Sequence, residues 1–122
     1  MSLKINVLGT EYSVCFRDYE ALRIFKDKGI DGYCDNIDKM IVICNMKTHP
    51  EYDVETEEYC HKLERLTLRH EIVHAFLSES GLCDSTLHFE AGWATNEEMV
   101  DWIALQFPKM LRAMKEAGCL ED

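Results

Sequence analysis

The chain has 122 residues, a formal net charge of −10 and a hydrophobic content of 47%. This length suits one domain, residues 1–122, with a single core, and the hydrophobic content excludes a disordered chain. The acidic balance argues against nucleic acid as a partner, because phosphate binding requires clustered Lys and Arg. No apolar run reaches the roughly 18 residues of a membrane span, and the amino terminus lacks a secretory pattern. We therefore expect an intracellular, cytoplasmic protein without a membrane segment.

The first fifty residues show the short period of β-structure. KINVLG and EYSVCF are expected strands that meet at a Gly9-Thr10 turn, and GYCD and KMIVICN form a second pair around residues 36–38. Between the pairs, DYEALRIFKDKG predicts a short helix that ends at Gly29. The continuous run MIVIC predicts a strand that is covered on both faces or lies over a cleft.

The rest of the chain shows helical spacing. From about Val54 to Ser80 the recurring apolar residues are Leu63, Leu66, Val73 and Leu77, and Gly81 ends this helix. After a loop, Thr95 or Asn96 can cap a final helix, which Pro108 bends or interrupts. That helix is expected to bury Val100, Ile103, Phe107, Leu111 and Met114. Together the two halves predict an α+β fold, with a small antiparallel or mixed sheet packed on two helices.

The stretch RHEIVH, within the first long helix, contains the candidate metal-binding and catalytic residues. Five His and fourteen Glu predict ~0.02 chance occurrences of His-Glu-x-x-His in this chain. Residues four apart on a helix point the same way, so His70 and His74 can bind one zinc ion. Glu71 is rotated by about 100° from His70 and can take a proton from a water molecule that the metal activates. The alternative is a structural pair of hydrogen-bonded histidines on the flank of the helix.

A third zinc ligand must come from elsewhere, because the extended motif with a third histidine is absent: residue 80 is Ser. Glu97 and Glu98 open the next helix. The helical wheel places Glu97 at the border of its apolar stripe and Glu98 almost opposite, which favours Glu97. Asp101, four residues after Glu97, can accept a hydrogen bond from a zinc-binding histidine. Glu98 stays open as a ligand or as a solvated helix start.

HEIVH followed by NEEMVDWIALQFP resembles the gluzincin arrangement, in which His-Glu-x-x-His precedes Glu-x-x-x-Asp on a second helix. More narrowly, it is similar to the ImmA/IrrE-type metallopeptidases of phages and mobile elements, whose second helix reads roughly Glu-x-x-Ala-Asn-x-Phe-Ala and ends near a proline. The residues in comparable places are Glu97, Val100, Asp101, Ile103, Ala104 and Pro108. Val100 replaces the usual Ala, Asp101 the usual Asn, and the proline comes two positions early.

The resemblance covers about Glu64 to Pro108. It implies zinc-ligand roles for His70, His74 and Glu97, and a catalytic-base role for Glu71. It also implies a minimal zincin-like fold, in which one strand borders the cleft; MIVIC fits that strand, which can pair with an extended substrate. Such peptidases typically cut a repressor or similar regulatory protein, so the implied partner is a protein substrate of this kind.

Two functions follow from this pattern. The first is a zinc-dependent endopeptidase, with one zinc ion per chain, that acts on a specific intracellular protein. The second is a non-catalytic, zinc-stabilised interaction module, which would not need Glu71. His88 is a further candidate for binding substrate or stabilising an oxyanion, against a plain surface histidine. The six cysteines form no Cys-x-x-Cys pair, and we expect them to be buried free thiols.

Overall fold

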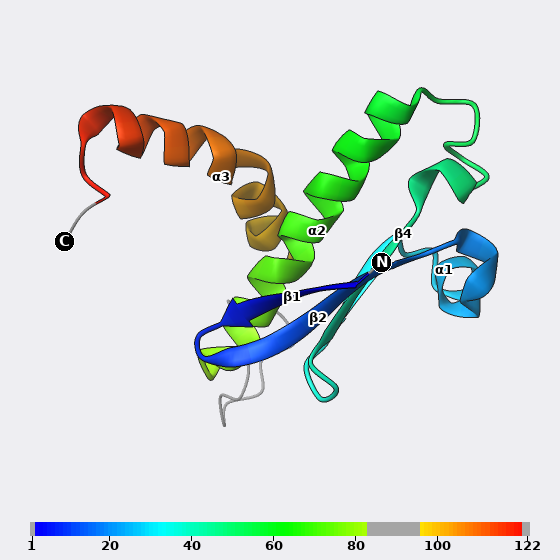
Figure 1. The fold of residues 1–122 in the computed structure, drawn as a ribbon, viewed down its shortest axis with the longest axis horizontal. Helices are drawn as coiled ribbons and strands as arrows, with labels where there is room; N and C mark the ends of the chain where they lie inside the picture. The colour runs from blue at the N-terminus through cyan, green and yellow to red at the C-terminus, as the bar shows by residue number, and fades with distance from the viewer. Residues whose placement is uncertain (1, 83–95, 121–122) are drawn as a thin grey trace.

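A computed structural model describes residues 2–82 and 96–120. The strands are β1 (Ser2–Val7), β2 (Thr10–Arg17), β3 (Gly32–Asp35) and β4 (Met40–Cys44). The long helices are α2 (Glu57–Glu79) and α3 (Glu97–Ala117). Short helices complete these elements: η1 (Tyr19–Ala21), α1 (Arg23–Asp27) and η2 (Met46–Thr48). A sheet followed by two long helices confirms the predicted α+β fold (Figure 1).

The sheet is mixed, with the strand order β1-β2-β4-β3. β1 pairs antiparallel with β2, β2 parallel with β4, and β3 antiparallel with β4. β4 therefore lies inside the sheet, where Ile41 and Ile43 are buried on one face and Val42 and Cys44 on the other. The expectation of a strand covered on both faces is confirmed. The assignment of MIVIC to the strand that borders the cleft is wrong, because β3 occupies that edge.

Two helix boundaries differ from the prediction. α2 begins at Glu57 rather than near Val54, because the Thr56 side chain caps it by accepting a hydrogen bond from the Tyr59 N–H. The single short helix expected before Gly29 is divided into η1 and α1, since Leu22 between them has an extended backbone. Among residues 2–82 and 96–120, no helix has both the length and the apolar character needed to cross a membrane.

α2 lies across the sheet and is held at both ends by carboxylates (Figure 1). Ala75 is fully buried in a cluster with residues of β1, β2 and β4. Toward the start of the helix, Glu64 accepts a hydrogen bond from the Met46 N–H at 2.9 Å. At its end, Glu79 accepts from the Tyr12 hydroxyl at 2.8 Å and from Lys39 Nζ at 2.6 Å. These contacts define the rotation of α2 about its axis.

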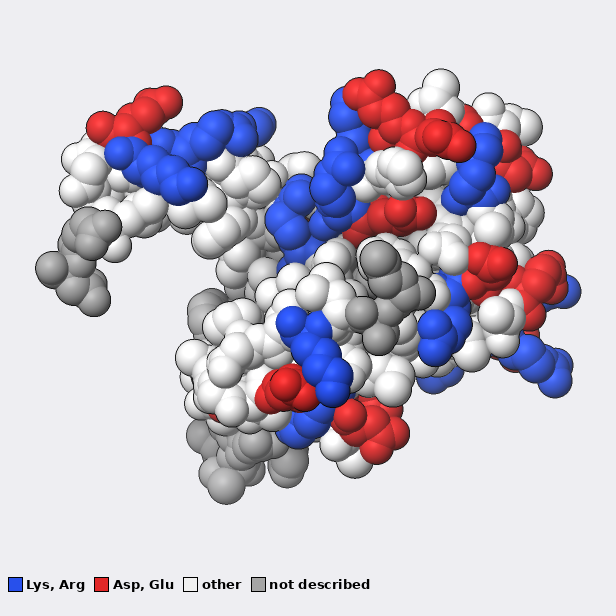
Figure 2. All heavy atoms as spheres, in the orientation of Figure 1, with Lys and Arg blue, Asp and Glu red and all other residues white. Residues whose placement is uncertain are grey.

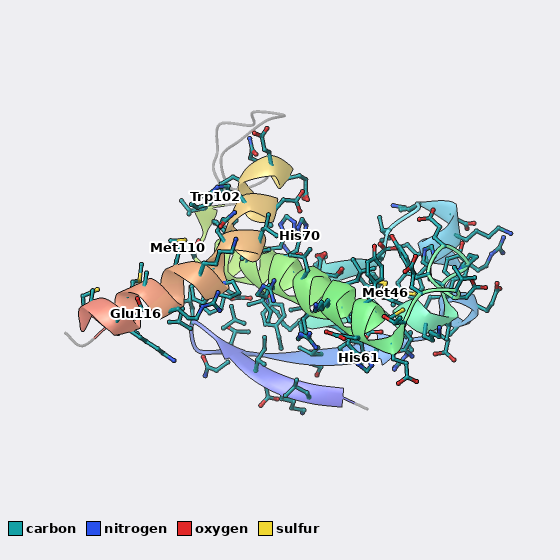
Figure 3. All side chains as sticks on the ribbon, turned by 90° about the horizontal axis from the view of Figure 1, so that it is seen from above. Met46, His61, His70, Trp102, Met110 and Glu116 are labelled. Atoms are coloured by element: carbon teal, nitrogen blue, oxygen red, sulfur yellow. The ribbon has the colours of Figure 1, made fainter. Side chains whose placement is uncertain are left out.

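α3 packs on α2 through its first half only. Val100 and Ala104 are buried, whereas Phe107 and Met114 are 48% and 39% exposed, so the prediction of burial is confirmed for Val100 and wrong for these two. Pro108 lies within the continuous helix, and its ring displaces the preceding turn. Figure 3 shows α3 changing direction between Trp102 and Met110. The second half leads away from α2, and Figure 2 shows Lys and Arg side chains gathered over it.

The cysteines within the described residues are free thiols, as predicted. Cys15, Cys44 and Cys60 are buried and Cys34 is half-buried. Cys119, just after α3, is exposed, so the prediction of burial is wrong for this residue. Cys83 lies outside the described residues.

We expect Glu79→Gln to destabilise the fold at neutral pH. The hydrogen bonds from Lys39 and Tyr12 lower the pKa of Glu79 below its usual 4.5. A depressed carboxylate pKa stabilises the folded state above the unfolded pKa, and this contribution is lost as the pH falls through the folded pKa. Urea titrations at pH 7 and near pH 3 measure the effect: the gap between wild type and variant should narrow in acid. A Glu11→Gln control, which removes an exposed ion pair with Lys4, should change little.

Candidate metal centre

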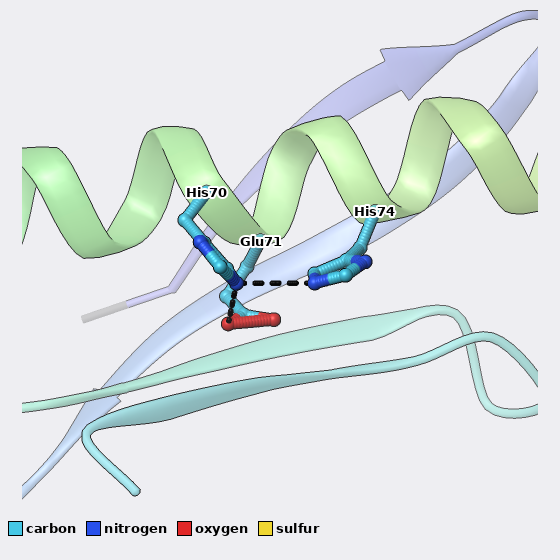
Figure 4. Close-up of side chains that lie close together, drawn as sticks. All are labelled: His70, Glu71 and His74. Carbon is cyan, nitrogen blue, oxygen red and sulfur yellow. Dashed lines mark hydrogen bonds and ion pairs between the residues drawn. The ribbon is translucent and has the colours of Figure 1, made fainter. Parts of the chain in front are cut away.

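α2 presents His70 and His74 side by side. Their Nε2 atoms are 3.0 Å apart, as expected for residues one turn apart on one helix face. Figure 4 shows both rings projecting from α2 on the same side, with Glu71 beside His70. The Glu71 carboxylate is 4.0 Å from His70 Nε2, and the residue is only 7% exposed. Glu71 thus lies close enough to form a possible metal-binding group with the two histidines, but it is farther from His70 Nε2 than Glu97 is, at 4.0 Å against 3.0 Å.

Glu97, the first residue of α3, completes a triangle of polar atoms. Its Oε2 is 3.0 Å from His70 Nε2, and its Oε1 is 2.9 Å from His74 Nε2. Asn96 holds this end of α3 by accepting the Met99 N–H at 2.8 Å, which confirms it as the cap. The neighbouring Glu98 is exposed, and no ion pair of the described residues joins it to this cluster. The helical geometry that favoured Glu97 over Glu98 agrees with these positions.

Asp101 contacts the outer nitrogen of His70. The distance from Asp101 Oδ1 to His70 Nδ1 is 2.6 Å. Because a carboxylate only accepts, the proton of this bond belongs to Nδ1 of His70. In the neutral ring, Nε2 then carries a lone pair and faces the triangle. This is the tautomer that a histidine needs to bind a metal through Nε2.

A cation at the centre of the triangle would relieve a repulsion between two acceptor atoms. With neutral His70, the lone pair of Nε2 faces the Glu97 carboxylate at 3.0 Å, and neither atom has a proton to donate. A metal cation between them, or a proton on Nε2, removes this repulsion. Ligand atoms of a tetrahedral zinc ion with bonds of about 2.0–2.1 Å lie about 3.3 Å apart. With Oε2 of Glu97 as the oxygen ligand, the observed spacings are 3.0 Å to His70 Nε2, 3.4 Å to His74 Nε2 and 3.0 Å between the two nitrogens, within a few tenths of an ångström of that. The donor set therefore fits a small divalent cation.

Burial changes the acidity of two groups in this cluster. It raises the pKa of Glu71 to about 7, helped by the nearby carboxylates of Glu97 and Asp101 and opposed by His70. Burial also lowers the pKa of His74, which favours its neutral, metal-binding form. A carboxyl group with a pKa near neutrality can both accept and release a proton at physiological pH.

The polar cluster opens into a cleft of about 480 Å³ between α2 and the edge strand β3. Gly32, Tyr33 and Cys34 of β3 form one wall, and His70, Glu71, His74 and Glu97 form the other. A second hollow of about 230 Å³ shares Gly32, His70 and Glu71 and continues the cleft past Asp101. The polar cluster therefore lies where these two hollows meet, beside β3.

Two of the features that shape this groove escaped the sequence interpretation. Gly32 lets β3 approach α2 closely: a Cβ there would lie 2.9 Å from both Ile43 Cδ1 and Thr67 Cγ2. Asn36, in the turn after β3, donates to Ser78 Oγ at 2.9 Å and joins that turn to the end of α2. Gly32, which follows Asp31, is the only residue whose type could have pointed to either feature in the sequence. His88 lies outside the described residues.

The structure brings all five predicted site residues together: His70, Glu71, His74, Glu97 and Asp101. Searches of known protein families, of curated proteins and of solved structures find no match to this chain.

We expect Gly32→Ala to cost about 1–3 kcal/mol of stability, because the added methyl group overlaps Thr67 and Ile43. Thr67→Ser removes one of the two clashing methyl groups and should restore part of the loss when combined with Gly32→Ala. Chemical denaturation of both single variants and the double variant measures this coupling. Purely additive effects would show that β3 and α2 are not in the contact described.

Proposed function

We propose that this chain is a zinc-dependent endopeptidase. One observation carries the proposal: the Nε2 atoms of His70 and His74 and the carboxylate of Glu97 lie about 3 Å from one another, and a buried glutamate of raised pKa lies beside them. Perturbed carboxyl groups next to a metal-binding cluster in a cleft are typical of catalytic sites. The motif and its spacing point to the same chemistry.

Zinc suits the ligands better than calcium or magnesium, which prefer oxygen donors. His70, His74 and Glu97, which line the cleft, would supply three ligands, the usual number for a catalytic zinc ion. A structural zinc site is usually closed by four protein ligands. Asp101 would keep His70 in the required tautomer. We therefore favour the catalytic function over a zinc-stabilised interaction module.

When bound, zinc would polarise a substrate carbonyl and lower the pKa of a water molecule to about 7. The carboxylate of Glu71 would accept a proton from that water as the water oxygen bonds to the peptide carbonyl carbon. Glu71 would then deliver this proton to the amide nitrogen as the carbon–nitrogen bond breaks. A cation held by the two histidines favours the ionised form of Glu71, which is the form that starts the reaction.

The substrate would be a polypeptide in extended conformation. β3 is an edge strand that borders the cleft, and no strand of the described residues pairs with its outer side, so this side could pair with a peptide. The similarity of the motif to ImmA/IrrE-type peptidases suggests a repressor-like intracellular regulator as the protein substrate. A short cleft in a small domain suits a narrow choice of substrate.

The third ligand can be tested with a matched pair of variants. Glu97→Gln should weaken zinc binding by about tenfold or more, since an amide is a much poorer ligand than a carboxylate. Glu98→Gln removes the same charge from the same helix turn, and with it the same interaction with the helix dipole, but should leave the affinity nearly unchanged. Competition with a chromophoric chelator gives both dissociation constants. Equal affinities would show that Glu97 is not a ligand.

Glu71→Gln separates the enzyme from the interaction module. The variant should keep one zinc ion per chain, measured by elemental analysis, because Glu71 lies outside the ligand triangle. Its peptide cleavage should fall by about 10²–10⁴-fold, the usual cost of losing a general base. Incubation of wild type and variant with a peptide library, followed by mass spectrometry of new termini, measures the loss.

Three outcomes of these experiments would count against the proposal. A wild-type protein that stays free of metal after zinc supplementation would reject the zinc site. Equal cleavage by wild type and Glu71→Gln would reject the assigned base. Stoichiometric zinc without any cleavage by the wild type would favour the interaction module.

A further inference from the structure

Pro108 leaves one backbone carbonyl of α3 without its helical partner. In a regular helix the N–H of residue 108 would donate to the carbonyl oxygen of Ala104, but proline has no N–H. Ala104 is 1% exposed, so water cannot readily take the place of that donor. A buried carbonyl without a donor costs free energy comparable to a lost hydrogen bond.

Arg69 supplies the missing donor from the neighbouring helix. Its Nε lies 2.6 Å from the Ala104 carbonyl oxygen, in a partly buried contact between residues 35 positions apart in the chain. Arg69 directly precedes His70 on α2. The Pro108 that bends α3 thus also creates the acceptor through which α2 binds α3.

The polar contacts of α3 with α2 come from one row of residues. Glu97, Asp101 and Ala104 are separated by four and three residues, so they lie on the same face of the helix, one turn after another. Along this row Glu97 contacts His74 and His70, Asp101 contacts His70, and Ala104 contacts Arg69. The partners step back along α2 from His74 to Arg69 as the row advances, and together they fix where the first half of α3 crosses α2. The Arg69 contact is the one in this row that involves neither a metal-binding side chain nor a carboxylate.

We propose that Arg69 is a positioning residue for the metal centre. By satisfying the carbonyl that Pro108 leaves free, it fixes the position of α3 on α2 and so holds Glu97 and Asp101 against the histidines. The inference deepens the proposed zinc function and rests on it for the metal readout, whereas the Arg69–Pro108 link can also be tested without metal.

The sign of the effect on zinc binding distinguishes positioning from simple electrostatics. Arg69 is a cation close to the metal site, and by Coulomb repulsion its removal should strengthen zinc binding. Loss of a positioning hydrogen bond should instead weaken it. Arg69→Met keeps most of the apolar stem of arginine and removes the donor, so a change in packing contributes little.

The experiment is a double-mutant cycle of Arg69→Met and Pro108→Ala, read by zinc competition. Arg69→Met alone should weaken zinc binding by about tenfold, the equivalent of one charge-assisted hydrogen bond. Pro108→Ala restores an N–H that can donate to Ala104 within α3. In that background Arg69→Met should therefore weaken binding by less than about threefold. The visible spectrum of the Co²⁺-loaded protein should shift in Arg69→Met and return in the double variant, which a general loss of stability would not produce.

Arg65→Met is the matched control, because it removes an exposed cation one turn earlier on α2 and should leave zinc binding unchanged or slightly stronger. Equal effects of Arg69→Met in the two backgrounds, or stronger zinc binding in Arg69→Met, would overturn the proposal.

The thermal stability of the metal-free variants gives the same cycle without zinc. Arg69→Met should lower the melting temperature by about 5 °C when Pro108 is present, and by less in the Pro108→Ala background. If the wild type binds no zinc, the zinc function fails, and this second cycle still accepts or rejects the Arg69–Pro108 link.

Discussion

Helix α2 has one rotation about its axis that buries Ala75 against Ile41 and Ile43, and this rotation determines where the histidines point. His70 and His74 lie on the flank of the buried face, so they reach the border between the core and the cleft. Glu64 and Glu79 hold the two ends of the helix to the backbone and side chains of the sheet region. A change in rotation would break these contacts and move both histidines together. The packing of one helix on one sheet therefore underlies the geometry of the whole cluster.

The cluster concentrates negative charge that the fold alone does not neutralise. Glu71 is buried, and Glu97 and Asp101 add two carboxylates within hydrogen-bonding distance of the same histidine pair. The start of α3 favours Glu97 through the helix dipole, but no Lys or Arg of the described residues forms an ion pair with these three groups. Like charges held close together raise the free energy of the folded state unless a cation joins them. The cation in the proposed function would supply this compensating charge.

In α3, the irregularity at Pro108 affects how the helix packs on α2. Pro108 is costly within a helix, and it turns the exposed second half of α3 away from α2. In the first half, Val100 and Ala104 are buried against α2, and Glu97 and Asp101 lie next to the histidines. The apolar residues after the bend, such as Met114, consequently have little to pack against among residues 2–82 and 96–120. A regular amphipathic pattern predicts burial only where the helix continues in one direction.

The sequence by itself determined the local structure and the identity of the polar cluster. Helix caps, turn residues and hydrophobic periods act between residues close in the chain, so the two strand pairs and the two long helices could be predicted within a few residues. The spacing of His70, Glu71 and His74 needs only one helix, and the wheel of the second helix separated Glu97 from Glu98.

Only the tertiary structure decided what depends on contacts between distant segments. The strand order placed β4 inside the sheet and β3 at the cleft, because pairing of β2 with β4 is set by packing across the sheet rather than by either strand alone. The close approach at Gly32 and the bond from Arg69 to Ala104 likewise join residues far apart in the chain. Such contacts leave no periodic signal, since each depends on how two separately formed elements meet.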